Sequence, residues 1–309
     1  IYISHFLEEV REIAQRITVL RDGQSVMSGS MAELSMDQIV KSMVGRSIEE
    51  MYPRIPHEIG EVVLEADELQ GCKWPRQASF RLRRGEVLGV AGLVGSGRTE
   101  TLRCIFGLDP LSAGKLRIGG RDLAGSSSAG RSLRAGLDLL SENRKEEGLA
   151  VKLSLVTNIT LSGLKRYAAG GFLNLRRERE AAELLCGEVG VKCRSPLDPA
   201  TSLSGGNQQK VAIARMLHRG GDILLLDEPT RGIDVGSKAE IYRIILGLAA
   251  RGKAVIVVSS YLPELLGICD SLAVMYRGVM SPVLPVGQWS EDRIMHYATS
   301  GKWTGPQES

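Results

Sequence analysis

Short apolar runs along the chain are separated by stretches with helical spacing. The runs at 87–91, 223–226 and 254–258 predict strands, and the run at 223–226 is continuous, as expected of a strand covered on both faces. Helices are predicted at 98–106 and 237–250, between these strands. Because strands and helices alternate, the pattern predicts an α/β domain with a mostly parallel sheet.

Residues 1 to about 50 have the pattern of the end of a domain. A helical spacing of apolar residues runs from Leu7 to Ile17, residues 17–20 predict a strand, and residues 21–24 predict a turn. Pro53 and Pro56 indicate a linker, and a new domain is expected to begin with a strand near Val62.

Two segments near the start of the chain resemble two segments near its end. The sequence ISHFLEE at 3–9 parallels VSSYLPE at 258–264, and VLRDG at 19–23 parallels MYRG at 275–278. Two matched endings predict two copies of one domain, with most of the first copy missing. Since the first residue is Ile1 and the first segment already has the pattern of the middle of a domain, we expect the sequence to be a fragment of a longer chain.

Composition narrows the class of protein. The 309 residues are 43% hydrophobic and 24% charged, which is an ordinary globular composition, and a net charge of +3 is too small to argue for a nucleic-acid partner. The five cysteines form no C-x-x-C pair, which favours a reduced, cytosolic setting. No apolar run approaches the ~18–20 residues that cross a bilayer, so any role at a membrane is expected to act through a partner that spans it.

A glycine-rich segment follows the first predicted strand and has the spacing of a phosphate-binding loop. It consists of Gly92, Leu93, Val94, Gly95, Ser96, Gly97, Arg98 and Thr99. Glycines let backbone N–H groups wrap a phosphate, the dipole of the following helix acts on the same anion, and Thr99 offers a hydroxyl to Mg²⁺. Arg98 stands where this loop usually has lysine. Its guanidinium group is planar and its side chain is longer, so it need not place a donor between the last two phosphates of a bound nucleotide. Taken alone, the segment also fits a tight turn that binds nothing.

Two later segments favour nucleotide binding over that alternative. The first resembles the signature of ATP-binding-cassette (ABC) ATPases, and it consists of Leu203, Ser204, Gly205, Gly206, Asn207 and Gln208. Glycines at a helix start expose N–H donors and a positive dipole end to an anion. The second, ILLLDEPT at 223–230, resembles the Walker B motif of the same family. Its strand brings Asp227 to a sheet edge, where the carboxylate can hold Mg²⁺ through water.

The resemblance to ABC ATPases implies roles for several positions. It implies that the signature contacts the terminal phosphate of ATP held by an opposite domain, and that Glu228 polarises the attacking water. Asp234 would belong to the D-loop at the contact between domains. Glu142 lies where the family has a Q-loop glutamine, and Ser260 lies where it has a switch histidine. His5 occupies the switch position of the preceding copy.

The motifs together are similar to those of monosaccharide importers for ribose, galactose, arabinose and xylose. The stretches that carry this likeness are GLVGSGRTE at 92–100, SENRKEEGL at 141–149, LSGGNQQK at 203–210 and DEPTRGIDVG at 227–236. The resemblance implies a P-loop ABC fold with a mostly parallel core sheet, a helical signature subdomain at about 150–215 and an antiparallel β subdomain. Residues 1–52 would end a first cassette, 53–61 would be a linker, 62–300 would form the second cassette, and 301–309 would be a tail.

The resemblance also implies a mechanism and partners. We expect an ATPase that uses ATP and Mg²⁺ at the cytoplasmic face of the plasma membrane, bound to permease subunits and served indirectly by an extracellular sugar-binding protein. Because Arg98, Glu142 and Ser260 depart from the catalytic set, the site of the second cassette is expected to hydrolyse ATP poorly, and the isolated fragment to be weak or inactive. No residue is assigned to stack on adenine, and we expect Trp74 to have a core or loop role.

Other classes share these motifs and remain alternatives. A soluble ABC protein of translation would carry a long charged helical linker, and a repair protein would carry a coiled-coil or zinc insertion; neither is evident in the sequence. A non-hydrolysing regulatory cassette is favoured by the weakened site. Within transport, lipids, nucleosides or a signalling sugar derivative are alternatives to a plain monosaccharide.

Overall fold

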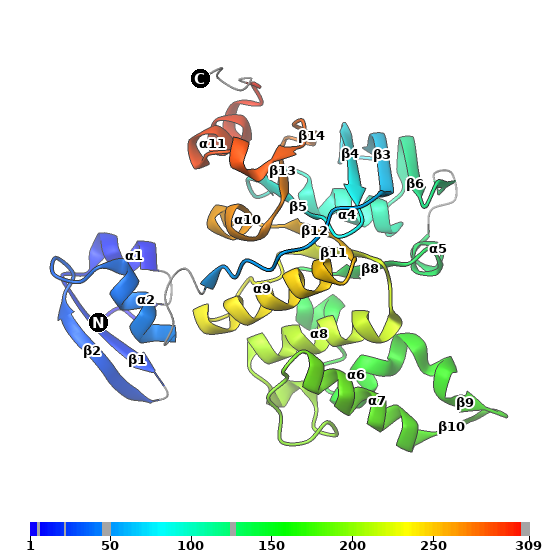
Figure 1. The fold of residues 1–309 in the computed structure, drawn as a ribbon, viewed down its shortest axis with the longest axis horizontal. Helices are drawn as coiled ribbons and strands as arrows, with labels where there is room; N and C mark the ends of the chain where they lie inside the picture. The colour runs from blue at the N-terminus through cyan, green and yellow to red at the C-terminus, as the bar shows by residue number, and fades with distance from the viewer. Residues whose placement is uncertain (5–6, 22, 45–50, 124–127, 304–309) are drawn as a thin grey trace.

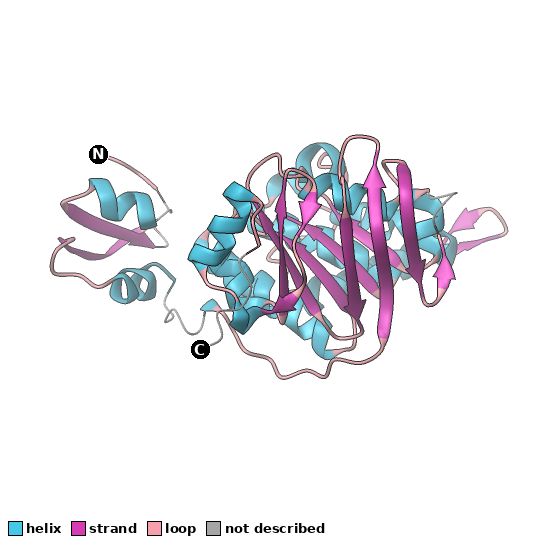
Figure 2. Cartoon of the chain, turned by 90° about the horizontal axis from the view of Figure 1, so that it is seen from above, coloured by secondary structure: helices cyan, strands magenta, loops and turns pink. Residues whose placement is uncertain are grey.

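The computed structural model describes residues 1–4, 7–21, 23–44, 51–123 and 128–303. Its first elements form a small unit of helix α1 (Leu7–Ile13), strands β1 (Arg16–Arg21) and β2 (Gln24–Ser30), and helix α2 (Met36–Val44). Figures 1 and 2 show this unit beside the larger body of the molecule. The two strands form an antiparallel hairpin in which Arg16 pairs with Ser30. The strand predicted at 17–20 is confirmed as part of β1. The helix predicted from Leu7 to Ile17 was wrong at its end, because α1 ends at Ile13 and Ile17 lies in the hairpin.

The main sheet has the strand order β14-β13-β5-β12-β11-β8, with β15 paired to β13. Its parallel strands are β5 (Val87–Gly92), β8 (Leu137–Leu140), β11 (Ile223–Asp227), β12 (Ala254–Val258) and β13 (Ser271–Tyr276). The short strands β14 (Val279–Met280) and β15 (Leu284–Pro285) both pair antiparallel with β13, on the side away from β5. The predicted α/β class with a mostly parallel sheet is confirmed.

A second, antiparallel sheet has the order β4-β3-β6-β7. Its strands are β3 (Val62–Gly71), β4 (Ala78–Arg83), β6 (Leu111–Ile118) and β7 (Arg121–Asp122). This sheet and helix α4 (Arg98–Phe106) share one apolar core with one face of the main sheet. The helix expected at 98–106 and the strand expected near Val62 are both confirmed.

Helices cover the other face of the main sheet. They are α8 (Gly205–Arg219), α9 (Val235–Ala250), α10 (Leu262–Ile268) and α11 (Glu291–Ser300). Along β11, Leu224 and Leu226 enter the helical core, whereas Ile223 and Leu225 enter the core under the second sheet. A run that is apolar at every position is thus explained by burial on both faces.

A helical layer lies beyond α9 in Figure 1. It contains α6 (Leu155–Thr160), α7 (Leu175–Glu188) and α8, with the small hairpin β9 (Ala168–Ala169) and β10 (Phe172–Leu173) at its far end. Helix α5 (Ala129–Arg134) lies before β8. Short helical turns cover Arg144–Gly148, Leu161–Tyr167, Ala200–Ser202 and Val286–Gln288. In the described part of the chain, no helix is both long enough and apolar enough to span a membrane.

Candidate nucleotide site

The carboxyl ends of three neighbouring strands define the candidate site. Strand β12 lies between β5 and β11 in parallel register, with Asp227 opposite Val258 and Val258 opposite Val90. The loops that follow these strands therefore leave the sheet at the same edge. Ligands of open parallel sheets bind at such an edge, because loops and helix N-termini converge there.

The phosphate loop, residues 92–99, runs from the end of β5 to the start of α4. Gly95 and Gly97 have φ values of 78° and 102°, which only glycine adopts readily. A Cβ atom on Gly97 would lie 3.3 Å from the Cα atom of Gly278 and 3.3 Å from the Cβ atom of Trp74. Leu93 and Val94 are exposed, whereas Ser96 is buried and its hydroxyl has no hydrogen-bond partner. The loop therefore has the close packing and the unsatisfied polar group of an anion cradle.

Arg98 and Glu228 form a buried ion pair at the centre of this edge. Arg98 Nη2 lies 3.3 Å from Glu228 Oε1, and the two side chains are only 8% and 9% exposed. Burial lowers the pKa of Arg98, and the charges of Glu228 and Asp227 oppose this effect. Arg98 Nη1 is buried without a partner. The arginine that replaces lysine is thus held by the carboxylate to which the family resemblance assigns water activation.

The backbone of Glu228 is in the left-handed region, with φ of 47°. Its N–H donates to the carbonyl of Val258 at 2.8 Å, which fixes the residue to the end of β12. A non-glycine residue in this region costs on the order of 1–3 kcal/mol, and such strain is retained where the surroundings impose it, often at functional sites.

Asp227 and Thr99 are the residues that fit a metal ion. Asp227 is 3% exposed, and its Oδ1 has no hydrogen-bond partner. Burial raises the pKa of Asp227 to about 6, against the effect of a hydrogen bond from Thr99. No group of three or more His, Cys, Asp or Glu side chains that could hold a metal occurs among the residues that the structure describes. One carboxylate and one hydroxyl fit Mg²⁺, which takes its other ligands from water and substrate phosphates.

Glu142 pairs with the residues that follow Walker B. Its carboxylate contacts the guanidinium of Arg231. Arg144, which the sequence analysis did not single out, donates to the carbonyl of Gly205 at 2.6 Å and to that of Arg231 at 3.5 Å. These contacts join the segment after β8 to both the signature turn and the loop after β11.

The signature turn begins helix α8 at the surface. Ser204 is exposed and caps the helix, because its Oγ accepts from Asn207 N at 3.4 Å and from Asn207 Nδ2 at 3.1 Å. A Cβ atom on Gly206 would lie 2.5 Å from Ser237 Oγ, so this glycine is needed for close packing against α9. Leu203 is half-buried, and Gln208 is buried and donates to the carbonyls of Ala200 and Leu203. Ser204, at the N-terminus of α8, is therefore accessible from solvent, as a contact with an anion requires.

Three predicted positions remain. Two of them, Asp234 and Ser260, lie in the loops that follow β11 and β12. Asp234 is exposed and caps α9 through the Ser237 N–H at 3.0 Å. Ser260 is exposed in the loop after β12. His5 lies outside the described residues. Sequence reasoning missed Thr230 and Glu264, which meet beneath this loop.

Trp74, expected in a core or loop role, lies against the base of the phosphate loop. Its ring would be 1.9 Å from a Cβ atom on Gly278, so the ring covers that glycine closely. The guanidinium of Arg76 lies 4.8 Å from the ring centroid. This packing is consistent with the loop role that the sequence indicated.

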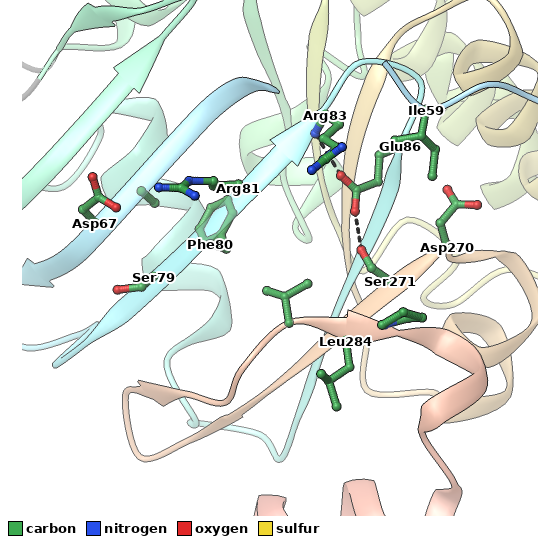
Figure 3. A pocket seen from close by; sticks show the side chains of 13 residues that line it. Ile59, Asp67, Ser79, Phe80, Arg81, Arg83, Glu86, Asp270, Ser271 and Leu284 are labelled. Atoms are coloured by element: carbon green, nitrogen blue, oxygen red, sulfur yellow. Dashed lines mark hydrogen bonds between the residues drawn. The ribbon is translucent and has the colours of Figure 1, made fainter. Parts of the chain in front are cut away.

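A surface cavity of about 820 Å³ lies away from this edge (Figure 3). It is lined by residues of β4, β15 and the start of β13, among them Glu86, Asp270 and Ser271. Glu86 accepts hydrogen bonds from the Ser271 hydroxyl and from Arg83 N, and Asp270 accepts from Val87 N at 2.8 Å. Glu86 directly precedes β5 and Asp270 directly precedes β13, so these carboxylates lie at the opposite ends of the strands from the phosphate loop.

The fold and this edge define a P-loop nucleotide-binding cassette. A family model described as ABC transporter matches residues 75–231. The chain belongs to the ABC transporter family.

Longer relatives match nearly the whole chain. The xylose import ATP-binding protein XylG of Burkholderia ambifaria is 48% identical over 286 residues, which cover 90% of this chain and 55% of that protein. The ribose import ATP-binding protein RbsA of Bacillus subtilis is 41% identical over 302 residues, which cover 98% of this chain and 61% of that protein. This chain thus spans only 55% and 61% of the lengths of these relatives.

Solved structures share the fold. The dimeric post-hydrolysis state of the ATP-binding cassette MJ0796, bound to ADP and Pi, has a TM-score of 0.63 at 20% identity and covers 72% of this chain and 98% of that chain. The ATP-binding cassette MJ1267 in its ADP conformation has a TM-score of 0.60 at 19% identity and covers 78% of this chain and 96% of that chain.

Proposed function

We propose that this chain is part of an ATP-binding subunit that energises the import of a simple sugar through a separate membrane permease. The observation that carries this proposal is the extent of the likeness to xylose and ribose import ATP-binding proteins, which covers 90% and 98% of this chain. The subunit would bind ATP and Mg²⁺ on the cytoplasmic face of the membrane and would contact the sugar-binding protein only indirectly.

The repeated elements support two cassettes in the whole protein. A helix, a strand pair and a helix follow one another in α1-β1-β2-α2, and α10, β13, β14 and α11 follow in a similar order with the short strand β15 added before α11. We infer that residues 1–52 end a first cassette, that 53–61 form a linker, and that 62–300 form a second cassette with a helical part at about 150–215. Residues 301–309 would be a tail.

The nucleotide site of the second cassette is proposed to bind ATP and to hydrolyse it slowly. Glu228 must present its carboxylate to water if it is to polarise it, yet its Oε1 lies 3.3 Å from Arg98 Nη2 in a buried pair. Separating such a pair is costly, because it leaves charge unpaired in the interior. Ser260 cannot supply the charge or reach of an imidazole at the switch position.

The signature turn is proposed to serve a different ATP. Ser204 and the N-terminus of α8 are at the surface, where a second domain can bring a triphosphate. The first cassette would supply its own phosphate loop and His5, and residues 204–208 of this chain would complete the site. Most hydrolysis would occur there, and closure of the two domains would drive the permease between its inward and outward states.

A transport assay on the whole protein with its permease tests this division of roles. Ser204→Ala is expected to abolish ATP-driven uptake of labelled ribose, galactose or xylose, whereas Glu228→Gln is expected to reduce it mildly. Ser290→Ala is the matched control, since Ser290 caps α11 in the same way, through the N–H of Arg293 at 3.2 Å. Equal losses in the Ser204 and Glu228 variants would contradict the proposal.

The buried Arg98–Glu228 pair also favours a second candidate, a regulatory cassette that binds nucleotide without a permease. The isolated chain should bind ATP and show no steady hydrolysis under either proposal. Only an import subunit should respond to its permease, so ATP turnover by the whole protein that does not change when permease is added would favour the regulatory role.

A further inference from the structure

The loop that follows β12 is anchored by a buried carboxyl group. Glu264, in the first turn of α10, is 1% exposed and accepts a hydrogen bond from Ser259 Oγ at 2.6 Å. The same hydroxyl accepts from the N–H of Tyr261 at 3.1 Å. Ser259 and Tyr261 flank the switch position, Ser260, so these bonds fix the backbone on both of its sides.

The second partner of Glu264 belongs to a different loop. Thr230 Oγ1 donates to Glu264 Oε1 at 3.0 Å, and both groups are buried. Thr230 lies two residues after Glu228 and immediately before Arg231, which pairs with Glu142. One carboxyl therefore holds the loop after β11 and the loop after β12 together beneath the candidate site.

The first part of the chain repeats half of this arrangement. Ser4 Oγ donates to Glu9 Oε2 at 3.3 Å, across the same five-residue spacing that separates Ser259 from Glu264. In each copy, the serine comes immediately before the switch position, which is histidine in one copy and serine in the other. Because the bond occurs with either residue, it serves the loop rather than the chemistry of that residue.

We propose that Glu264 is a positioning residue that couples the loop of the switch position to the loop of Glu228. This inference rests on the proposed function for its meaning in transport, but the coupling itself requires neither ATP nor permease. The buried setting supports it, since burial raises the pKa of Glu264 to about 7 while the hydrogen bonds from Ser259 and Thr230 oppose the shift. Removing either hydroxyl would leave a buried polar atom without its partner, which is costly.

Hydrogen exchange of the full 309-residue chain, followed by mass spectrometry, tests the coupling. Ser259→Ala should speed exchange about tenfold in a peptide covering 228–234, although that peptide lacks the mutated residue. Thr230→Val, which keeps the side-chain shape, should speed exchange in a peptide covering 259–262. Glu264→Ala should affect both peptides, and Glu264→Gln should affect them less because its amide oxygen still accepts a hydrogen bond.

Ser281→Ala is the matched control, because Ser281 is also buried and its hydroxyl accepts from Val274 N at 2.9 Å, away from both loops. It should leave both peptides unchanged. Acceleration confined to the loop that carries each substitution would overturn the proposal. So would equal acceleration throughout the chain, which would indicate loss of global stability. A failed transport assay with intact coupling would instead count against the proposed function alone.

Discussion

The two ends of this chain, which we propose are two copies of one domain end, have similar elements in very different surroundings. In the second copy, β13 lies between β5 and the short strands β14 and β15, and it is buried along almost its whole length. In the first copy, β1 pairs only with β2 in the part of the chain that the structure describes. Leu20 in β1 is 70% exposed, whereas Met275, at the matching position of β13, is fully buried. Met275 packs into the apolar core beneath the second sheet, whereas no such layer lies against Leu20 in the part of the chain that the structure describes. Val19, on the opposite face of β1, is buried. Hairpin pairing therefore depends on the local sequence, and burial depends on what packs against each face of the strand.

Truncating the side chains at these two positions should give the largest difference in the free energy of unfolding. Met275→Ala leaves a cavity in the core and should lower the free energy of unfolding by about 2–5 kcal/mol. Leu20→Ala in the same chain should change it by no more than about 0.5 kcal/mol, because its side chain is already in solvent. Urea unfolding followed by circular dichroism measures both.

The comparison can be sharpened in the longer protein that we propose. If a further layer packs against this face of β1 there, Leu20→Ala should become as destabilising as Met275→Ala. Similar small effects of Leu20→Ala in both contexts would show that no such layer packs against Leu20.

The buried carboxyl of the second copy should make stability depend on pH. The pKa of Glu264 is raised to about 7, chiefly by burial, so the folded protein keeps a proton that the unfolded chain releases near 4.5. Stability should therefore fall as pH rises from about 4.5 to 7, by on the order of 3 kcal/mol. Lys238 lowers the pKa, whereas Glu228 raises it.

Glu264→Gln should remove this part of the pH dependence, measured as the difference in unfolding free energy between pH 5 and pH 7. Glu9→Gln is the control, because Glu9 occupies the matching position in the first copy and is exposed. A pH dependence that stays unchanged in Glu264→Gln would refute the assignment to this carboxyl.

A smaller pH dependence of stability is expected from His57, in the segment between α2 and β3. His57 Nε2 lies 3.0 Å from Asp270, just before β13, and its Nδ1 lies 2.8 Å from the Ile55 carbonyl. Burial lowers the pKa of His57, but these contacts outweigh it and the net shift is upward. The stabilisation is therefore complete below the unfolded pKa of about 6.5 and is lost as pH rises through the folded pKa.

His57→Gln should accordingly destabilise the chain more at pH 6 than at pH 8, by about 1 kcal/mol or less at the lower pH. Thermal unfolding at the two pH values measures the difference. The same loss at both would mean that the imidazole acts through packing rather than through its charge.

The sequence predicted the sheet edge well and its side-chain contacts poorly. The strand ending at Asp227 followed from a continuous apolar run, and the helix at Arg98–Phe106 followed from the glycine-rich loop before it. The Arg98–Glu228 pair depends on the left-handed backbone of Glu228, which no pattern of residue types indicates. Glu264 was missed because a glutamate in a first helical turn is usually exposed. The repeated Ser–Glu spacing at 4–9 and 259–264 was the signal that could have identified it.

The cap of helix α8 has a chemical consequence. A hydroxyl oxygen has two lone pairs, and in Ser204 both are engaged by the nitrogens of Asn207. Its hydrogen is then the only hydrogen-bonding capacity left. An ammonium or a metal ion arriving at this position would find no electron pair available, whereas an anionic oxygen would find a proton donor already oriented by the helix.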